Sequence, residues 1–319
     1  MTKPYVVGID VGGQTTKLGI VDARGNVLEQ SVIRTDNHTD AKLFIADLAK
    51  AVNELIEISG GKDKIRGIGV GAPNGNYYTG KIVSAPNLAW GRSEVDFANM
   101  LSNETGIPVA LTNDANAAAV GEMTYGAARG MKHFIMITLG TGVGSGIVIN
   151  GEVVYGYDGF AGELGHTISE KTNGRPCGCG RNGCLETYAS ATGVARTARE
   201  ILETTDKDSL LRKLDINKIS SKDVYDAAIQ GDEVALEIFR FTGKILGESL
   251  ANFVAFSAPE AVILFGGLTK AGDLIKNPII EHMNLNMLDL WKDNVKVIFS
   301  ELKESDAAIL GASALAWEL

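Results

Sequence analysis

Two stretches of the chain repeat the same succession of apolar and polar positions. The first is apolar over residues 5–9 and 18–21, with a polar turn that contains Gly12 between the two runs. The second, residues 134–149, has the sequence FIMITLGTGVGSGIVI and again places a glycine turn between two apolar runs. Each pattern is typical of two strands joined by a tight turn. Gly12 lies 128 residues before Gly140, so the repeat has the size of a domain and predicts two similar lobes.

The rest of the chain alternates short buried strands with helices. Strands are expected at residues 65–71, 107–112, 261–265 and 295–300, and helices at 42–59, 115–122, 187–204, 221–230, 233–257 and 305–318. This alternation indicates an α/β fold. A chain of 319 residues is long enough for two domains that each bury a core. We expect a smaller N-terminal lobe at 1–118 plus 305–319 and a larger C-terminal lobe at 119–304.

Both glycine turns are suited to phosphate groups. Glycines let backbone N–H groups approach phosphate oxygens closely, and neighbouring hydroxyl and ammonium groups add donors. The residues expected to contact phosphate are Gly12, Gly13, Thr15 and Lys17 in the first turn and Gly140, Thr141 and Gly142 in the second. Asp10, at the end of the first strand, is placed to hold a hydrated Mg²⁺. One copy alone could be an ordinary hairpin, but the second copy favours a nucleoside triphosphate held between two such turns.

The second turn, GTGVG, also resembles the glycine pattern of dinucleotide-binding folds. In those folds the glycines open a helix whose N-terminus binds pyrophosphate. Here an apolar strand and an Asn-Gly hairpin turn at 150–151 follow instead, which argues against a nicotinamide cofactor.

Two further strand ends carry candidate site residues, because ligands of open α/β sheets bind at the carboxyl ends of strands. Asp114 follows the strand at 107–112 and is the candidate general base. Its alternative role is helix capping, which Asp often performs. Gly266 and Gly267 follow the strand at 261–265 and form a third glycine turn. That turn could lie against the adenine or ribose of a nucleotide, or simply connect a strand to a helix.

All three cysteines of the chain, Cys177, Cys179 and Cys184, lie within eight residues, and His166 lies eleven residues upstream of the first. Three thiolates and one imidazole form a complete tetrahedral shell for zinc. Three unrelated buried thiols are the alternative, but scattered cysteines would rarely fall in so short a window. A disulfide framework would leave one cysteine over. Four protein ligands leave no open position, so the expected Zn²⁺ is structural.

Two glutamates flank these ligands, Glu163 on one side and Glu186 on the other. A loop fixed by zinc would hold both carboxylates and the imidazole of His166 around a small polar ligand. His166 could bind the metal through one ring nitrogen and offer the other to a ligand oxygen. Hydroxyls donate and accept hydrogen bonds, so this set suits a sugar. For either glutamate alone, ordinary surface charge would be the favoured interpretation.

Composition and charge exclude several classes of partner. A net charge of −9 and a pI near 5.1 argue against non-specific binding of nucleic acid and against attachment to an anionic membrane. No apolar run approaches the ~20 residues that span a bilayer. The first strand begins too early for a signal peptide, so a cytoplasmic location is expected.

These motifs together resemble the ROK family of sugar kinases and repressors, in the actin-like/hexokinase superfamily. The resemblance runs from residue 5 to the C-terminus, and the segment CGCGRNGCLE is its most specific part. It implies a two-lobed actin-like (ribonuclease H-like) ATPase fold with a duplicated βββαβα core and an inserted zinc loop. It also implies phosphorylation of a hexose with ATP and Mg²⁺, and a homodimer or tetramer.

The resemblance also implies a role for individual residues. Asp114 matches the general base. The residues that match sugar ligands are Asn87, Asn113, Asp114, Glu163, His166 and Glu186, and those that match zinc ligands are His166, Cys177, Cys179 and Cys184. The segment from Pro86 to Trp90 resembles the glucokinase members, which makes glucose the expected hexose. N-acetylmannosamine, mannose, fructose and allose are the alternatives.

Two positions depart from the family pattern. Gln14 stands where the family usually has Thr, so its phosphate contact is expected to pass to Thr15 or to backbone N–H groups. Asn74 replaces a common Gly, and Asn tolerates a positive φ well.

The rival function is a sugar-responsive repressor. Such a repressor would carry an N-terminal helix-turn-helix, for which a first strand that starts at Tyr5 is expected to leave too few residues. A sugar-binding protein without catalysis is the third reading, and the presence of Asp10, Asp114 and both turns argues against it.

Overall fold

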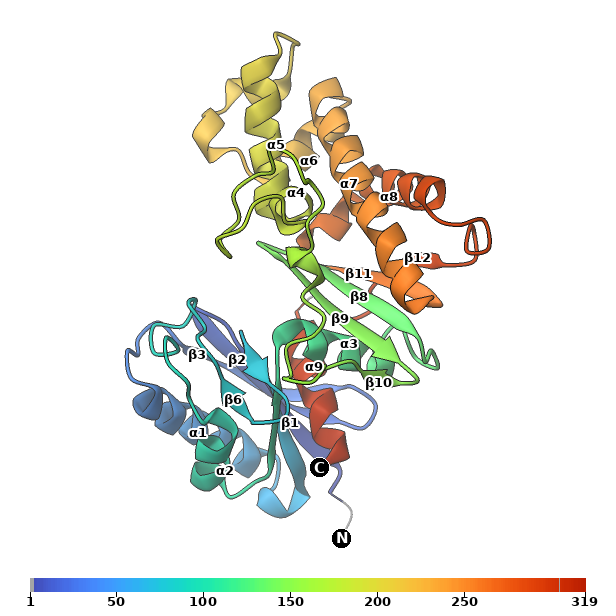
Figure 1. The fold of residues 1–319 in the computed structure, drawn as a ribbon. Coiled ribbons are helices and arrows are strands. Elements are labelled where there is room, and N and C mark those ends of the chain that lie inside the picture. Colours follow the sequence, from blue (N-terminus) through green and yellow to red (C-terminus); the bar gives the residue numbers. More distant parts are fainter. Residues whose placement is uncertain (1–2, 304) are drawn as a thin grey trace. The chain divides into compact units, whose positions relative to one another are not determined.

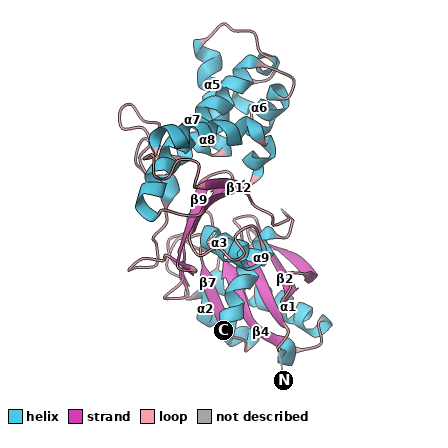
Figure 2. Ribbon diagram, turned by 90° about the vertical axis from the view of Figure 1, so that its right-hand side faces the viewer, coloured by secondary structure: helices cyan, strands magenta, loops and turns pink. Residues whose placement is uncertain are grey.

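A computed structural model describes residues 3–303 and 305–319, and their packing divides the chain into two compact units. Unit 1 comprises the described parts of Met1–Met131, Gly146–Gly162 and Ser300–Leu319, and unit 2 comprises Lys132–Ser145 and Glu163–Phe299. Each unit combines strands with helices (Figures 1 and 2). The chain is therefore an α/β protein, as its pattern predicts.

The two five-stranded sheets have the same strand order. The first runs β3-β2-β1-β4-β7, built from β3 (Val27–Arg34), β2 (Thr15–Asp22), β1 (Tyr5–Val11), β4 (Ile65–Gly71) and β7 (Val109–Thr112). The second runs β10-β9-β8-β11-β12, built from β10 (Glu152–Val153), β9 (Val143–Ile149), β8 (Phe134–Leu139), β11 (Ala261–Phe265) and β12 (Lys296–Phe299). In the first sheet β1–β2 and β2–β3 pair antiparallel, whereas β1–β4 and β4–β7 pair parallel. The sequence repeat thus corresponds to a repeated fold.

Helices cover both faces of the first sheet (Figure 2). They are α1 (Ala41–Ile58), α2 (Phe97–Thr105), α3 (Asp114–Tyr125) and α9 (Ala307–Leu315). Alternate residues of β1 point to opposite faces, so Val7 packs in the core with α1 and α2, while Val6 packs with α9. Glycine lets α9 lie close to the sheet: a Cβ on Gly69 would lie 1.9 Å from the carbonyl oxygen of Ala312.

The helices of unit 2 are α4 (Glu186–Ala189), α5 (Ala191–Thr204), α6 (Ser221–Ala228), α7 (Glu233–Ser257) and α8 (Asp273–Asn286). The bounds of α7 are those predicted. The helix expected at 187–204 is divided, because Ser190 has extended backbone angles and its Oγ accepts a hydrogen bond of 3.0 Å from the N–H of Gly193. That contact caps α5 and ends α4.

β3 and α2 are among the elements that have no counterpart in the sequence analysis. β3 is an edge strand whose residues are mostly exposed or half-buried, so it lacks the apolar pattern of a buried strand. α2 has nine residues, which is too short for a clear helical period. The helix expected at 305–318 is also shorter, since regular α-helix covers Ala307–Leu315 and a 3₁₀ turn follows at Ala316–Glu318.

Two turns have the backbone conformations that their residues predict. Asn74 has a φ of 52°, and its side-chain amide donates to the carbonyl oxygens of Val83 and Ser84 at 3.1 and 3.0 Å. The Asn150-Gly151 turn has positive φ at both residues, 55° and 80°, as a tight hairpin between β9 and β10 requires. It is this hairpin, and not a helix, that follows the second glycine turn.

The division into units follows packing. Unit 1 takes all of α3 together with Gly146–Gly162, because Gly146 of β9 lies against α3, where a Cβ would come within 2.8 Å of the Cβ of Ala119. The lobe boundary expected after residue 118 falls inside α3, and the one expected after residue 304 involves a residue outside the described ranges. The lobe boundaries themselves stay a prediction.

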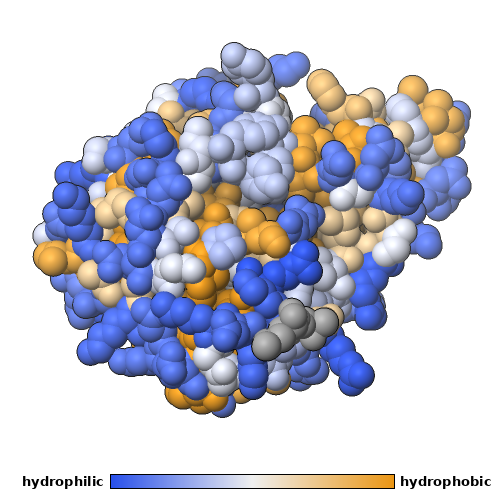
Figure 3. Space-filling model, turned by 90° about the horizontal axis from the view of Figure 1, so that it is seen from below, coloured by the Kyte–Doolittle hydropathy of each residue, from blue (hydrophilic) through white to orange (hydrophobic). Residues whose placement is uncertain are grey.

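The surface carries mixed polar and apolar residues. Figure 3 shows one face on which hydrophilic residues surround smaller hydrophobic areas. Within residues 3–303 and 305–319, every helix is too short or too polar to cross a membrane.

Candidate functional site

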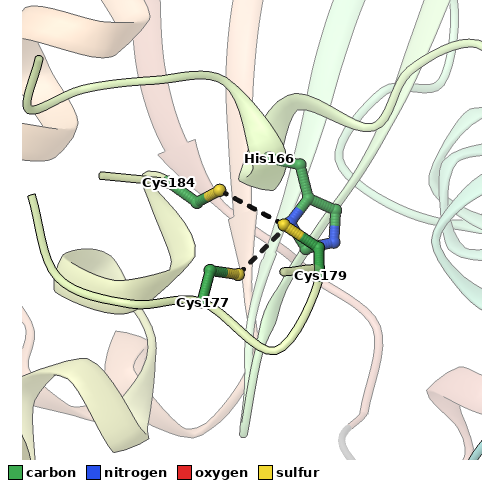
Figure 4. A group of neighbouring side chains, drawn as sticks. All are labelled: His166, Cys177, Cys179 and Cys184. Atoms are coloured by element: carbon green, nitrogen blue, oxygen red, sulfur yellow. Dashed lines mark hydrogen bonds between the residues drawn. The ribbon is translucent and has the colours of Figure 1, made fainter. Parts of the chain in front are cut away.

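His166 and the three cysteines form one cluster in unit 2 (Figure 4). Their candidate ligand atoms all lie within 4.8 Å of one another. The Sγ of Cys177 lies 3.7 Å from Nδ1 of His166, and the Sγ atoms of Cys179 and Cys184 are 3.6 Å apart. Thiolates and imidazole about a zinc ion at ~2.3 and ~2.0 Å would have such separations, so these residues fit a tetrahedral zinc site.

The loop reaches this geometry through tight backbone turns. The N–H of Cys177 donates to the carbonyl oxygen of Arg181 at 2.8 Å, which returns the chain from the first cysteine toward the third. Gly183 has a φ of 81°, and a Cβ there would lie 1.9 Å from the carbonyl oxygen of Glu170. Hydrogen bonds from Arg181 lower the pKa of Cys179 to about 6, which favours the thiolate that a metal binds.

Glu186 connects the cysteine loop to the second glycine turn. It is the first residue of α4, and its Oε2 accepts a hydrogen bond of 3.0 Å from the N–H of Val143 at the start of β9. Its Oε1 lies 3.8 Å from the Sγ of Cys177. Gly142 leaves room for this carboxylate, because a Cβ at that position would lie 2.3 Å from Oε2. Glu186, predicted as a sugar ligand, is therefore also part of the turn.

A pocket of about 430 Å³ in unit 2 joins the second and third glycine turns. Gly140 and Thr141 line it on one side and Gly267 on another, and Tyr225 and Phe239 contribute rings. A cavity of this size with an apolar lining and a few polar groups suits a small ligand such as a nucleoside. The turns at Gly140 and Gly267 therefore line the same pocket. The sequence analysis gave no role to the α6 and α7 residues here, since neither helix carries a recognisable motif.

The first glycine turn lies in unit 1 between β1 and β2. The N–H of Gly12 donates to the carbonyl oxygen of Thr15 at 3.1 Å. A Cβ on Gly13 would lie 2.7 Å from the carbonyl oxygen of Asn87, so the loop that carries Asn87 rests on this turn. The side chain of Gln14 is exposed. This places a predicted sugar ligand next to predicted phosphate ligands.

Asp10 ends β1 beside this turn and interacts with Asp114. Burial, and then the negative charge of Asp114, raise the pKa of Asp10 from 3.8 to about 6, although Lys17 opposite on β2 lowers it. The two carboxylates therefore repel each other in the absence of a cation.

Asp114 is the first residue of α3, but it is not the helix cap. Asn113 takes that role, because its side chain accepts a hydrogen bond of 2.7 Å from the N–H of Asn116. Asp114 is accessible to solvent, and its Oδ1 accepts from the N–H of Ala115 at 2.9 Å. Desolvation by the surrounding protein raises the pKa of Asp114. The hydrogen bond from Ala115 lowers this pKa, but by less. The capping alternative for Asp114 is thus filled by its neighbour.

The structure groups the predicted residues by unit. In unit 1 it brings together Asp10, Gly12, Gly13, Thr15, Lys17, Asn87, Asn113 and Asp114 around the ends of β1 and β7. In unit 2, Glu163 is exposed and precedes the 3₁₀ turn Leu164–His166 that carries His166, and Gly266 packs with φ 108° against Leu139 at the end of β8. That both groups bind the same substrates stays a prediction.

Comparison with known proteins gives a consistent result. A family model described as the ROK family matches residues 6–318. A glucokinase from Halalkalibacterium halodurans is 38% identical over 322 residues, which cover 99% of this chain and 96% of that protein. A ROK family glucokinase from Streptomyces griseus, in a crystal structure with glucose and AMPPNP, superposes with a TM-score of 0.81 at 31% identity and covers 99% of this chain and 100% of its own. A xylose repressor from Bacillus spizizenii is 27% identical and covers 98% of this chain and 77% of its own.

Asp10→Asn is expected to stabilise the unliganded protein at pH 7.5 by about 1–3 kcal/mol. The folded pKa of Asp10 is about 6, against 3.8 ordinarily, so the folded state holds a proton that the unfolded chain releases between these values. The stability that this proton gives is complete below pH 4 and is lost as the pH rises through 6. Urea unfolding of both proteins at pH 7.5 and pH 4 measures the difference, which should nearly vanish at pH 4.

Asp22→Asn provides a control of opposite sign. Burial raises the pKa of Asp22, but hydrogen bonds from Asn26 and Arg24 outweigh it, and the net shift is downward. This variant should lose stability at pH 7.5 relative to pH 4. An Asp10→Asn protein that is no more stable than the wild type at pH 7.5 would show that Asp10 is not strained.

Proposed function

The chain belongs to the ROK family, and from this we propose that it is an ATP-dependent hexokinase that phosphorylates the 6-hydroxyl of glucose. One observation carries the proposal furthest. The carboxylate of Glu186 touches both the second glycine turn and the cysteine loop, so residues suited to a sugar and residues suited to a nucleotide belong to one connected site. A sugar kinase must bind its sugar and its nucleotide next to each other.

The sugar would be held by polar side chains beside the cysteine loop and at the start of α3. Nδ1 of His166 faces the cysteines, which leaves Nε2 for a sugar hydroxyl. Oδ1 of Asn113 caps α3, which leaves its amide N–H groups to donate. Asn87, Asp114, Glu163 and Glu186 complete the proposed set.

The chemical step is an in-line displacement. Asp114 accepts the proton of the 6-hydroxyl as that oxygen bonds to the γ-phosphorus of ATP, and the bond from phosphorus to the leaving oxygen of ADP breaks. The raised pKa of Asp114 makes it a stronger base than an ordinary carboxylate.

The nucleotide would bind through the two glycine turns and the pocket in unit 2. Backbone N–H groups of the turns at Gly12-Gly13 and Gly140–Gly142, with Thr15 and Lys17, would contact phosphate oxygens, and the pocket beside Gly266-Gly267 would take the nucleoside. Mg²⁺ near Asp10 would neutralise phosphate charge. The repulsion between Asp10 and Asp114 supports a cation there.

Zinc would act on structure alone. His166, Cys177, Cys179 and Cys184 supply all four ligands, so the metal would fix the loop between Glu163 and Glu186 and take no part in the reaction. The homodimer or tetramer that the family resemblance implies belongs to the same proposal.

Purified protein should release ADP from ATP faster with glucose than with any other hexose. A coupled ADP-release assay with glucose, mannose, fructose, allose and N-acetylmannosamine measures this, since the configuration of one hydroxyl or an added acetamide changes which pocket groups are paired. A higher kcat/KM for another sugar would assign the protein to that hexose. Sugar binding by calorimetry without ADP release would instead favour a sugar-responsive repressor or binding protein.

Asp114→Asn should lower kcat by about 10²–10⁴-fold, because the hydroxyl loses its proton acceptor. Glucose affinity by calorimetry should change little, since the amide still accepts a hydrogen bond. Asp96→Asn is the matched control, because Asp96 also lies at the start of a helix of unit 1, where, among the described residues, its carboxylate accepts only from the side-chain amide of Asn99. Near-normal kcat in Asp114→Asn would remove Asp114 from the role of base.

Cys179→Ser should release the metal and raise the KM for glucose, because Glu163, His166 and Glu186 lose their common support. Metal analysis of the purified wild type should find about one zinc per chain. Chelation of the wild type should mimic the variant, and zinc should restore only the wild type. Wild-type protein that is fully active and contains no zinc would contradict the ligand assignment.

A further inference from the structure

A buried arginine lies just before the cysteine loop in unit 2. Only 7% of the surface of Arg175 is exposed, and its backbone N–H donates to the hydroxyl of Tyr188 at 2.9 Å. The guanidinium carbon lies 4.5 Å from the centre of the Tyr188 ring and 5.9 Å from that of Phe241. A cation held against two rings is fixed in position as well as stabilised.

The guanidinium group donates in several directions at once. Nη1 donates to the carbonyl oxygen of Thr187 at 2.9 Å, and Nη2 donates to Oγ1 of Thr197 at 2.9 Å. Nε donates to Oε2 of Glu200 at 3.1 Å, and Nη2 forms a second, short bond to the same oxygen. A planar group with five fixed donors can satisfy this set, whereas an ammonium group cannot.

These contacts join the cysteine loop to the helices that follow it. The carbonyl oxygen of Arg175 accepts from the N–H of Gly183 at 2.9 Å, beside Cys184, and Cys177 is two residues further along the chain. On the other side, Thr187 and Tyr188 directly follow Glu186 in α4. Arg175 therefore ties the segment that bears the cysteines to the short helix that bears Glu186.

We propose that Arg175 is a positioning residue for the sugar site, which holds α4 so that the Glu186 carboxylate faces the substrate. This inference rests on the proposed function. α4 has only four residues and cannot keep its place by its own hydrogen bonds. Arg175 supplies that support through Thr187 and Tyr188, and it does so with atoms that the metal ligands do not use.

Arg175→Met tests the proposal, because methionine fills similar space without donors. The KM for glucose should rise about tenfold or more, while kcat at saturating glucose stays within about threefold, as expected when ground-state binding is lost. Zinc content should equal that of the wild type. Arg175→Lys should not restore the KM, since one ammonium group cannot reach Thr187, Thr197 and Glu200 together.

Arg196→Met is the matched control. Arg196 shares Glu200 with Arg175 through a 2.8 Å bond from Nε, but its other bond goes to Pro176 and not to α4. Its KM for glucose should stay within about twofold of the wild type. If Arg175→Met does not fold, Glu200→Gln replaces it, and a smaller rise in the same KM is expected.

Three results would overturn the proposal. The first is an unchanged KM in Arg175→Met, and the second is an equal fall of kcat and kcat/KM. The third is loss of zinc together with the rise in KM, because the metal would then explain the change. A wild type that does not phosphorylate glucose is a separate outcome, because it refutes the proposed function before any variant is compared.

Discussion

The hydrogen bond from the N–H of Val143 to the carboxylate of Glu186 is the constraint on which unit 2 depends. It joins residues 43 apart in the chain and fixes the spacing between the second glycine turn and the cysteine loop. The bond needs Gly142, because any side chain there would occupy the place of the carboxylate. The residue proposed to bind the sugar and the turn proposed to bind phosphate are thus joined by one hydrogen bond.

Much of the fold was predictable because its buried elements have a strong period. The two hairpins, β4, β11 and α7 appear where the apolar pattern places them. β3 was not predicted, because it is an edge strand with few buried residues. α4 and α5 were predicted as one helix, because the apolar pattern continues across Ser190. The break there depends on a single side-chain hydrogen bond, which a periodic pattern does not contain. Apolar periodicity records burial and says little about where local contacts interrupt an element.

The candidate site divides in the same way. The cluster of His166 and the three cysteines was predictable from their density along the sequence, because the four residues lie within nineteen positions. The cap at Asn113, the rings of Tyr225 and Phe239 in the pocket, and the contacts of Arg175 were not predictable, because each depends on neighbours that folding alone brings together. Arg175 in particular sits within a polar segment that looks like exposed loop. Its burial follows from one carboxylate, two rings and a backbone carbonyl contributed by α4, α5 and α7.

The two units hold their candidate residues in different environments. In unit 2, Glu186 and Arg175 make hydrogen bonds within the protein that join α4 to the second glycine turn and to the cysteine loop. In unit 1, Asp10 and Asp114 lie at the ends of a strand and at the start of a helix with raised pKa values and with each other as neighbours. Positive charge from a metal ion or a hydroxyl proton relieves that repulsion. Bonded polar groups in one unit and carboxylates with raised pKa values in the other agree with the proposed phosphoryl transfer. Substrate binding needs fixed geometry, and proton removal needs a carboxylate that gains by accepting a proton.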